Sequence, residues 1–173
     1  MKNHPIDATR KWVEEFVIGH NLCPFAKRPF DESRIRFAIC ESMDVEEQLT
    51  DFWREVELLE KLGSKELSNT LLIFPKGEKE FESFLGFFEL CEQLLEMQNK
   101  TSEFQLVAFH PKFQYDGYST KAPRNYSNRS PFPMIHILRT EEVTLATDHH
   151  DTLNIPDLNE KTLKRLSDEG YFQ

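Results

Sequence analysis

Residues 70–109 decide the fold class, and they read TLLIFPKGEKEFESFLGFFELCEQLLEMQNKTSEFQLVAF. The segment opens with a short apolar run that a proline and a glycine stop, as expected for a buried strand. Residues 80–97 then carry apolar side chains at helical spacing, and residues 104–109 form a second short apolar run that ends at His110. This order predicts two parallel strands joined by a crossover helix.

The residues before this segment repeat the pattern. Residues 35–39 alternate apolar and polar side chains and predict a strand, and Asp44 with Glu47 resembles a capping box for a helix that ends near Gly63. The carboxyl ends of parallel strands meet at one edge of a sheet, where open α/β folds bind ligands. We therefore predict a single α/β domain over residues 1–173, with a small parallel sheet of about three strands and helices on its faces.

Helices are expected at both ends of the chain. A first helix, capped by Asp7 or Thr9, should end near Gly19. After the third strand, Ser130 can cap a helix with a proline at its first position, and a strand over residues 134–138 is the alternative. Two further helices complete the predicted order α-β-α-β-α-β-loop-α-α-α.

The composition is that of a soluble globular protein. The 173 residues include 39% hydrophobic and 29% charged side chains, with a formal net charge of -9. That charge argues against nucleic acid or an anionic membrane as the main partner. No apolar stretch has the length of a signal peptide core or a membrane span, so a cytoplasmic location is expected. The three cysteines show no CxxC spacing, which fits reduced thiols in that compartment. Cys40 and Cys91 lie on the faces of predicted elements and are expected to be ordinary buried thiols.

The longest stretch without a predicted element is residues 112–133, KFQYDGYSTKAPRNYSNRSPFP. It holds three of the four tyrosines and four cationic side chains, and its only acidic residue is Asp116. Loops of this length are uncommon in compact domains and are usually functional or disordered. The aromatic content favours order, because disordered segments are poor in aromatic residues. We therefore expect this loop to build a site.

The second half of the loop predicts a pocket for a small anionic ligand. A helix beginning at Ser130 would offer unpaired N–H groups and a partial positive charge, and Arg129 would add a bidentate fork. Alternatively, the segment only caps a helix and Arg129 makes a structural ion pair. The predicted ligand-binding residues are Lys76, Tyr115, Asn125, Tyr126, Asn128, Arg129 and Ser130.

Three residues are candidates for catalysis. Cys23 lies in a polar loop over residues 21–34, where a thiol can be a nucleophile or a metal ligand. His110 follows the third predicted strand, and either His110 or His136 could convert Cys23 to a thiolate. Each has a structural alternative, as a buried thiol or a hydrogen-bonded histidine. The loop of Cys23 precedes the first strand, so its simplest placement is the sheet edge opposite His110.

Several blocks of the sequence together resemble a known family. They are NLCPFA at residues 21–26, His110-Pro111 followed by Phe113, Asn125-Tyr126, NRSP at residues 128–131, Pro133, and HILR at residues 136–139. In these blocks and their order, the chain resembles the bacterial domain of unknown function family 1415 from its first helix to its last. Ser127, Phe132 and Thr140 stand where threonine, tyrosine and glutamate are expected. The resemblance implies no activity, only that Cys23, His110, Asn125, Arg129 and His136 form one set.

Three hypotheses therefore remain open, and the sequence indicates neither a particular cofactor nor an oligomeric state. The first is a thiol-dependent enzyme with Cys23 as nucleophile, acting on a small anion. The second is a binding protein without catalysis that uses the same pocket. The third is a transition-metal site of Cys23, His110 and His136. Residues 148–151, Asp-His-His-Asp, also resemble a metal-binding tract, but adjacent side chains on a helix point apart, which favours a solvated turn.

Overall fold

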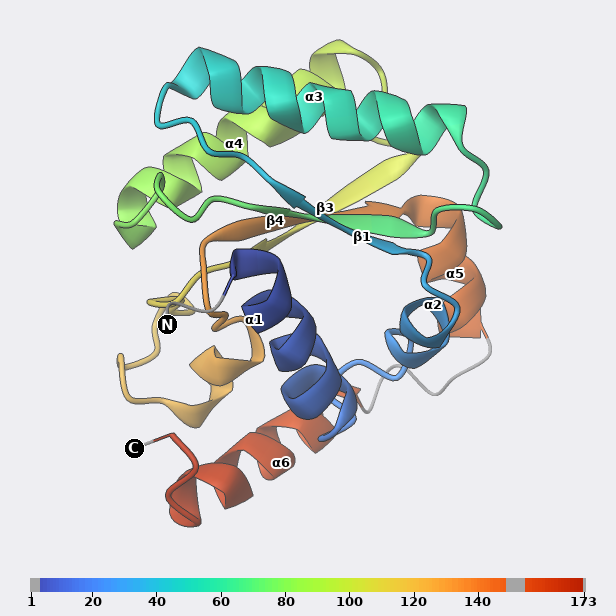
Figure 1. The fold of residues 1–173 in the computed structure, drawn as a ribbon. Helices are drawn as coiled ribbons and strands as arrows, with labels where there is room; N and C mark the ends of the chain where they lie inside the picture. The colour runs from blue at the N-terminus through green and yellow to red at the C-terminus, as the bar shows by residue number, and fades with distance from the viewer. Residues whose placement is uncertain (1–3, 149–154, 173) are drawn as a thin grey trace.

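Four strands form one mixed sheet with helices on both faces (Figure 1). The computed structural model describes residues 4–148 and 155–172, so His149, His150 and Asp151 of the possible metal tract lie outside the described residues. The sheet has the order β1-β2-β4-β3. Its strands are β1 (Ile35–Ile39), β2 (Asn69–Ile73), β3 (Phe104–Phe109) and β4 (Met134–Arg139).

The predicted three-stranded parallel sheet is wrong in one respect. β1 and β2 are parallel, but β4 lies between β2 and β3 and runs antiparallel to both. The helix expected at Ser130 does not form, and the alternative strand is the correct one. Met134, Ile135 and Ile137 are all fully buried because β4 is a central strand with both faces covered. Such a strand is apolar on successive residues, so a short apolar run does not distinguish it from a helix.

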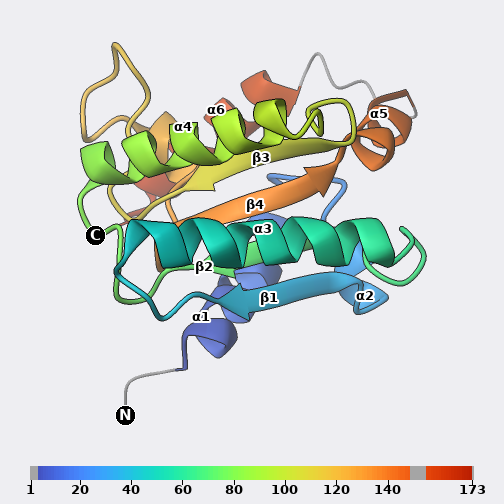
Figure 2. The same ribbon diagram turned by 90° about the horizontal axis from the view of Figure 1, so that it is seen from above.

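The edge predicted to carry the site is nevertheless present. β1, β2 and β3 run in the same direction because β4 is antiparallel to both of its neighbours. Their carboxyl ends therefore share one edge, and Figure 2 shows the β1 and β4 arrows pointing in opposite directions. The loop over residues 110–133 leaves β3 at this edge and enters β4 at the same edge.

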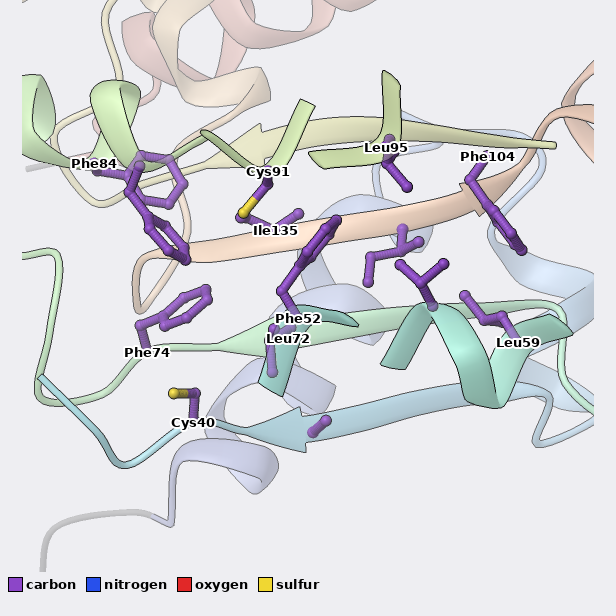
Figure 3. Close-up of a cluster of buried hydrophobic side chains, with 14 of the residues drawn as sticks. Cys40, Phe52, Leu59, Leu72, Phe74, Phe84, Cys91, Leu95, Phe104 and Ile135 are labelled. Atoms are coloured by element: carbon purple, nitrogen blue, oxygen red, sulfur yellow. The ribbon is translucent and has the colours of Figure 1, made fainter. Parts of the chain in front are cut away.

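Helices α3 (Val45–Lys61) and α4 (Phe81–Met97) cover one face of the sheet (Figures 1 and 2). The side chain of Asp44 caps α3 by accepting the N–H groups of Glu46 (3.0 Å) and Glu47 (3.1 Å). The predicted capping box is only half formed, because the Asp44 N–H donates to Ser42 Oγ (3.0 Å) and not to Glu47. The core under these helices includes Phe52, Phe84, Leu72 and Ile135 (Figure 3). Each such side chain contributes roughly 1.5–3 kcal/mol when fully buried.

The same core contains two of the three cysteines (Figure 3). Cys40 and Cys91 are fully buried, as the sequence predicted for ordinary core thiols. Burial raises the pKa of Cys40 to about 12 and also raises the pKa of Cys91. Both side chains therefore remain protonated at neutral pH and pack in the core as small apolar groups.

The other face of the sheet carries the remaining helices. They are α1 (Pro5–Trp12), which continues as the π-helix η1 (Val13–Ile18), α2 (Lys27–Asp31), the 3₁₀ helix η2 (Pro123–Ser127), α5 (Thr140–Asp148) and α6 (Ile155–Asp168). No described helix is both long and apolar enough to cross a membrane.

Two details at the N-terminal end differ from the sequence prediction. α1 begins with Pro5 at its first position, so Asp7 lies in the first turn and Thr9 is buried, and neither caps the helix. The loop predicted over residues 21–34 contains the short helix α2. The predicted end near Gly19 is correct, because η1 ends at Ile18 and Gly19 is its C-cap.

Candidate functional site

A cavity of about 310 Å³ lies on the face of the sheet that carries α1 and α6. The side chains that line it come from β3, the loop over residues 110–133, η1 with the turn after it, and α6. The apolar lining consists of Val17, Leu22, Val107, Phe109, Ile155, Pro156 and Leu163. The polar lining consists of Cys23, Tyr115, Arg124, Ser127, Asn128, Asn159 and Glu160.

The C-terminal helix α6 is fixed over this cavity by apolar contacts. Leu163 and Leu166 are buried in a small cluster with Phe16 and Leu22. Beyond the helix, the ring of Phe172 stacks on Tyr126 of η2 with centroids 3.6 Å apart. Residues that are far apart in the sequence thus meet in one small hydrophobic cluster, and two of its members, Leu22 and Leu163, line the cavity.

A polar network orders the part of the loop that lines the cavity. The Tyr115 hydroxyl donates to Asn128 Oδ1 (2.7 Å) and lies 3.1 Å from Ser127 Oγ. The amide nitrogen of Asn128 donates to the carbonyl oxygen of Ala108 in β3 (3.0 Å). The predicted ligand-binding residues Tyr115 and Asn128 therefore do line a cavity, and their polar atoms also attach the loop to the sheet.

Arg124 supplies the positive charge of the cavity. Its guanidinium carbon lies 5.2 Å from the ring centroid of Tyr115 and 5.1 Å from that of Tyr118, and Nη1 donates to the Tyr118 hydroxyl (3.0 Å). The closest acidic group is Glu160 of α6, with Nη1 and Oε2 3.9 Å apart. Sequence reasoning missed Arg124, although its place in the cationic, tyrosine-rich loop was the available signal.

Two residues predicted to bind the ligand instead hold the loop together. Asn125 is fully buried, and it accepts the N–H of Tyr115 (3.0 Å) and donates to the carbonyl oxygen of Ser119 (2.8 Å). Arg129 donates through Nε to the carbonyl oxygen of Phe113, at 3.0 Å. A second Arg129 hydrogen bond, from Nη2, reaches the Thr120 carbonyl oxygen at 2.6 Å.

The remaining predicted ligand-binding residues lie outside the 310 Å³ cavity. Ser130 donates to the carbonyl oxygen of Phe132 (2.6 Å), and because no helix begins there, the expected helix-terminus anion site is absent. Ser130, Tyr126 and Arg129 line a second, more open cavity of about 460 Å³ beside α1. Lys76 is exposed, pairs with Glu41 (2.7 Å), and lines neither cavity.

Cys23 lies in the wall of the 310 Å³ cavity and is half-buried. Burial raises the pKa of its thiol, and the backbone N–H groups of Phe25 and Ala26, which face the sulfur, oppose this effect only in part. Cys23 is therefore a neutral thiol at neutral pH. The predicted thiolate would require a cation or a general base beside the sulfur.

His110 is not in a position to activate Cys23. It is fully buried on the face covered by α4, with its ring 5.2 Å from that of Phe84. Nδ1 accepts the N–H of Lys112 (2.9 Å), so Nε2 donates to the carbonyl oxygen of Glu78 (3.0 Å). Burial lowers the pKa of His110. The structure thus favours the hydrogen-bonded structural histidine over the catalytic alternative.

His136 projects from the centre of β4 on the same face as Cys23. Nε2 donates to Asn69 Oδ1 (2.9 Å), and Asn69 contacts Ser68, whose hydroxyl donates to Glu142. The side chain of His136 is half-buried, and protein atoms surround its ring. The loss of solvation lowers the pKa of His136 to about 4. The imidazole is therefore neutral at pH 7.

These positions do not support the metal hypothesis for Cys23, His110 and His136, because His110 lies across the sheet from the other two. Within residues 4–148 and 155–172, no three His, Cys, Asp or Glu side chains are placed to share a metal ion. No hydrogen bond between described residues joins Cys23 to either histidine.

Comparison with family models matches residues 4–173 to the family described as Protein of unknown function (DUF1415). The chain belongs to this family. Comparisons with curated proteins and with solved structures find no match. In this DUF1415 member, the five residues expected to form one set divide into three groups. Cys23 and His136 share one face, Asn125 and Arg129 lie within the loop, and His110 lies on the opposite face.

Proposed function

We propose that the protein binds a small molecule with an apolar body and an anionic group in the 310 Å³ cavity. The observation that carries this proposal is the position of Arg124 at the mouth of a cavity whose interior is mostly apolar. The volume is at the lower end of the roughly 300–1,000 Å³ range of ligand pockets. A ligand of modest size would therefore fill it.

Arg124 is suited to this role because its position is defined before a ligand arrives. The rings of Tyr115 and Tyr118 support the guanidinium, and within the part of the chain that the structure describes the Tyr118 hydroxyl occupies one of its N–H groups. The side chain remains 39% exposed, so a carboxylate can approach the remaining donors. A charge-assisted hydrogen bond of this kind contributes about 1.5–3 kcal/mol.

The state of Cys23 favours binding over thiol catalysis. A cysteine nucleophile reacts as the thiolate, and burial of this thiol favours the protonated form. His136 is neutral and donates its Nε2 proton to Asn69, so it supplies no positive charge to a thiolate. Cys23 then serves as a polarizable part of the cavity wall, in contact with the bound molecule.

The test is a calorimetric titration with two apolar monocarboxylates, hydrocinnamate and 4-methylpentanoate. Wild type should bind at least one of them, and Arg124→Gln should weaken binding about tenfold or more by removing the charged donor. Val107→Phe should abolish binding by filling the cavity from β3. Arg28→Gln, a change to an arginine that is 83% exposed on α2, is the matched control and should bind as wild type does.

Failure of wild type to bind any small molecule that joins an apolar body to a carboxylate, or equal binding in wild type and Val107→Phe, would overturn the proposal. Arg129→Gln distinguishes the proposed cavity from the pocket around Arg129 that the sequence predicts. Because Arg129 holds the loop through the Phe113 and Thr120 carbonyl oxygens, this change should lower the thermal midpoint. At a temperature where the Arg129→Gln protein is still folded, this change should reduce carboxylate affinity less than Arg124→Gln does.

A further inference from the structure

The mouth of the cavity presents two opposite charges from different elements. Arg124 belongs to η2 and Glu160 to α6, and both line the cavity. Their closest atoms are 3.9 Å apart, which is longer than a hydrogen bond, and their side chains are 39% and 56% exposed. Such a pair contributes little to stability. Each group is therefore available to a ligand that approaches more closely.

Asn159 adds an acceptor beside Glu160. Its amide nitrogen donates to the carbonyl oxygen of Leu22 (2.8 Å), which fixes the side chain in the wall of the cavity. The amide oxygen is then the atom that Asn159 can offer to a ligand. An ammonium group has three donors and no acceptor. The carboxylate of Glu160 and the oxygen of Asn159 together suit such a group.

We infer that the cavity is specific for a zwitterion, a free α-amino acid with an apolar side chain; this inference rests on the proposed function. The ligand carboxylate binds Arg124, its ammonium binds Glu160 and Asn159, and its side chain enters the apolar interior formed in part by Val107 and Phe109. A simple carboxylate satisfies Arg124 but brings a second negative charge close to Glu160, and a phosphate brings more. Glu160 is therefore a specificity-determining residue.

The experiment compares four ligands that share one aromatic side chain. L-phenylalanine carries both charges, hydrocinnamate and N-acetyl-L-phenylalanine lack the ammonium, and L-phenylalaninamide lacks the carboxylate. Calorimetric titration of wild type should show L-phenylalanine binding about tenfold or more tightly than each of the others, since each of those loses one charge-assisted contact. L-leucine tests whether an aliphatic side chain is accepted.

Glu160→Gln should remove the preference for L-phenylalanine over hydrocinnamate, because it should weaken the binding of L-phenylalanine and strengthen the binding of hydrocinnamate. Arg124→Gln should instead remove the preference for L-phenylalanine over its amide. Glu169→Gln is the matched control, because Glu169 is 55% exposed near the end of α6 and pairs with Arg165 away from the cavity. It should leave all affinities unchanged.

The outcomes separate the two proposals. If hydrocinnamate binds wild type as tightly as L-phenylalanine does, or if Glu160→Gln leaves their ratio unchanged, the zwitterion inference is wrong. The proposed binding of an apolar anion would survive that result. If none of the ligands binds, or if Val107→Phe binds them all as wild type does, both the inference and the proposed function are wrong.

Discussion

Asn125→Ala should be among the most destabilising changes in the loop that lines the cavity. The side chain is fully buried and connects two turns of the loop. Its oxygen accepts the N–H of Tyr115 (3.0 Å), and its nitrogen donates to the carbonyl oxygens of Ser119 (2.8 Å) and, less closely, Thr120 (3.4 Å). Alanine leaves the Tyr115 N–H without this acceptor, whereas the carbonyl oxygen of the exposed Ser119 still accepts the N–H of Ala122 (3.0 Å).

The magnitude follows from the number of groups left unpaired. A buried polar group without a partner costs about 1–3 kcal/mol, so loss of the acceptor for the Tyr115 N–H should lower the free energy of unfolding by about that amount. Thr120 adds little because its carbonyl oxygen also accepts a hydrogen bond from Arg129. For a chain of this length, the thermal midpoint should fall by roughly 2–12 °C.

The assay is urea unfolding followed by tryptophan fluorescence, with hydrogen exchange at the Tyr115 amide. Gln93→Ala, which truncates an exposed amide on α4, is the control and should change stability by less than about 0.5 kcal/mol. Asn125→Asp should be at least as damaging as alanine near pH 7, because a buried carboxylate would face the Ser119 and Thr120 carbonyl oxygens. An Asn125→Ala protein with wild-type stability and a protected Tyr115 amide would refute this reasoning.

Three further predictions test other parts of the structure. Burial raises the pKa of Cys23, so iodoacetamide should alkylate this thiol at pH 8 more slowly in the folded protein than in the unfolded chain. His110→Ala should not change the rate in the folded protein, and mass spectrometry measures both rates. The pKa of His136 is about 4 in the folded protein and about 6.5 in the unfolded chain, so the unfolded chain binds this proton more tightly. The stability that depends on the neutral imidazole is therefore fully present above pH 6.5. That stability, about 3 kcal/mol, should be lost as the pH falls from 6.5 to 4 in wild type but not in His136→Gln, measured by urea unfolding at each pH. Phe84→Ala, at a fully buried position against His110, should cost about 3–5 kcal/mol in the same assay, and a loss below 1 kcal/mol would contradict the packing described.

The local pattern of the sequence was sufficient for most of the helices and strands. Asp44 marks the start of α3 because its side chain can accept two backbone N–H groups of the first turn. Gly19 is the C-cap of the first helical segment, and a side chain there would collide with the carbonyl oxygen of Glu15. The family membership, the two buried core thiols and the shared edge at the ends of β1, β2 and β3 also followed from the residues themselves.

Two features of the site could not be read from the pattern. Residues 134–138 are apolar on almost every position, and only burial on both faces of the finished sheet makes them a strand between β2 and β3. His110 directly follows β3, but which face its ring occupies depends on the alternation of side chains along that strand and on which helix covers each face. That alternation places His110 against α4 and leaves Val107 and Phe109 for the cavity that contains Cys23.

The sequence by itself therefore determined the type and limits of most elements, the family, and the long loop that lines the cavity. The type and limits of an element depend on interactions between residues a few positions apart. Only the tertiary structure decided that β4 separates β2 from β3, that Cys23 and His110 lie on opposite faces, and that Arg124 meets Glu160. Each of these requires segments distant in the sequence to pack together, and such contacts depend on how the whole chain buries its apolar surface.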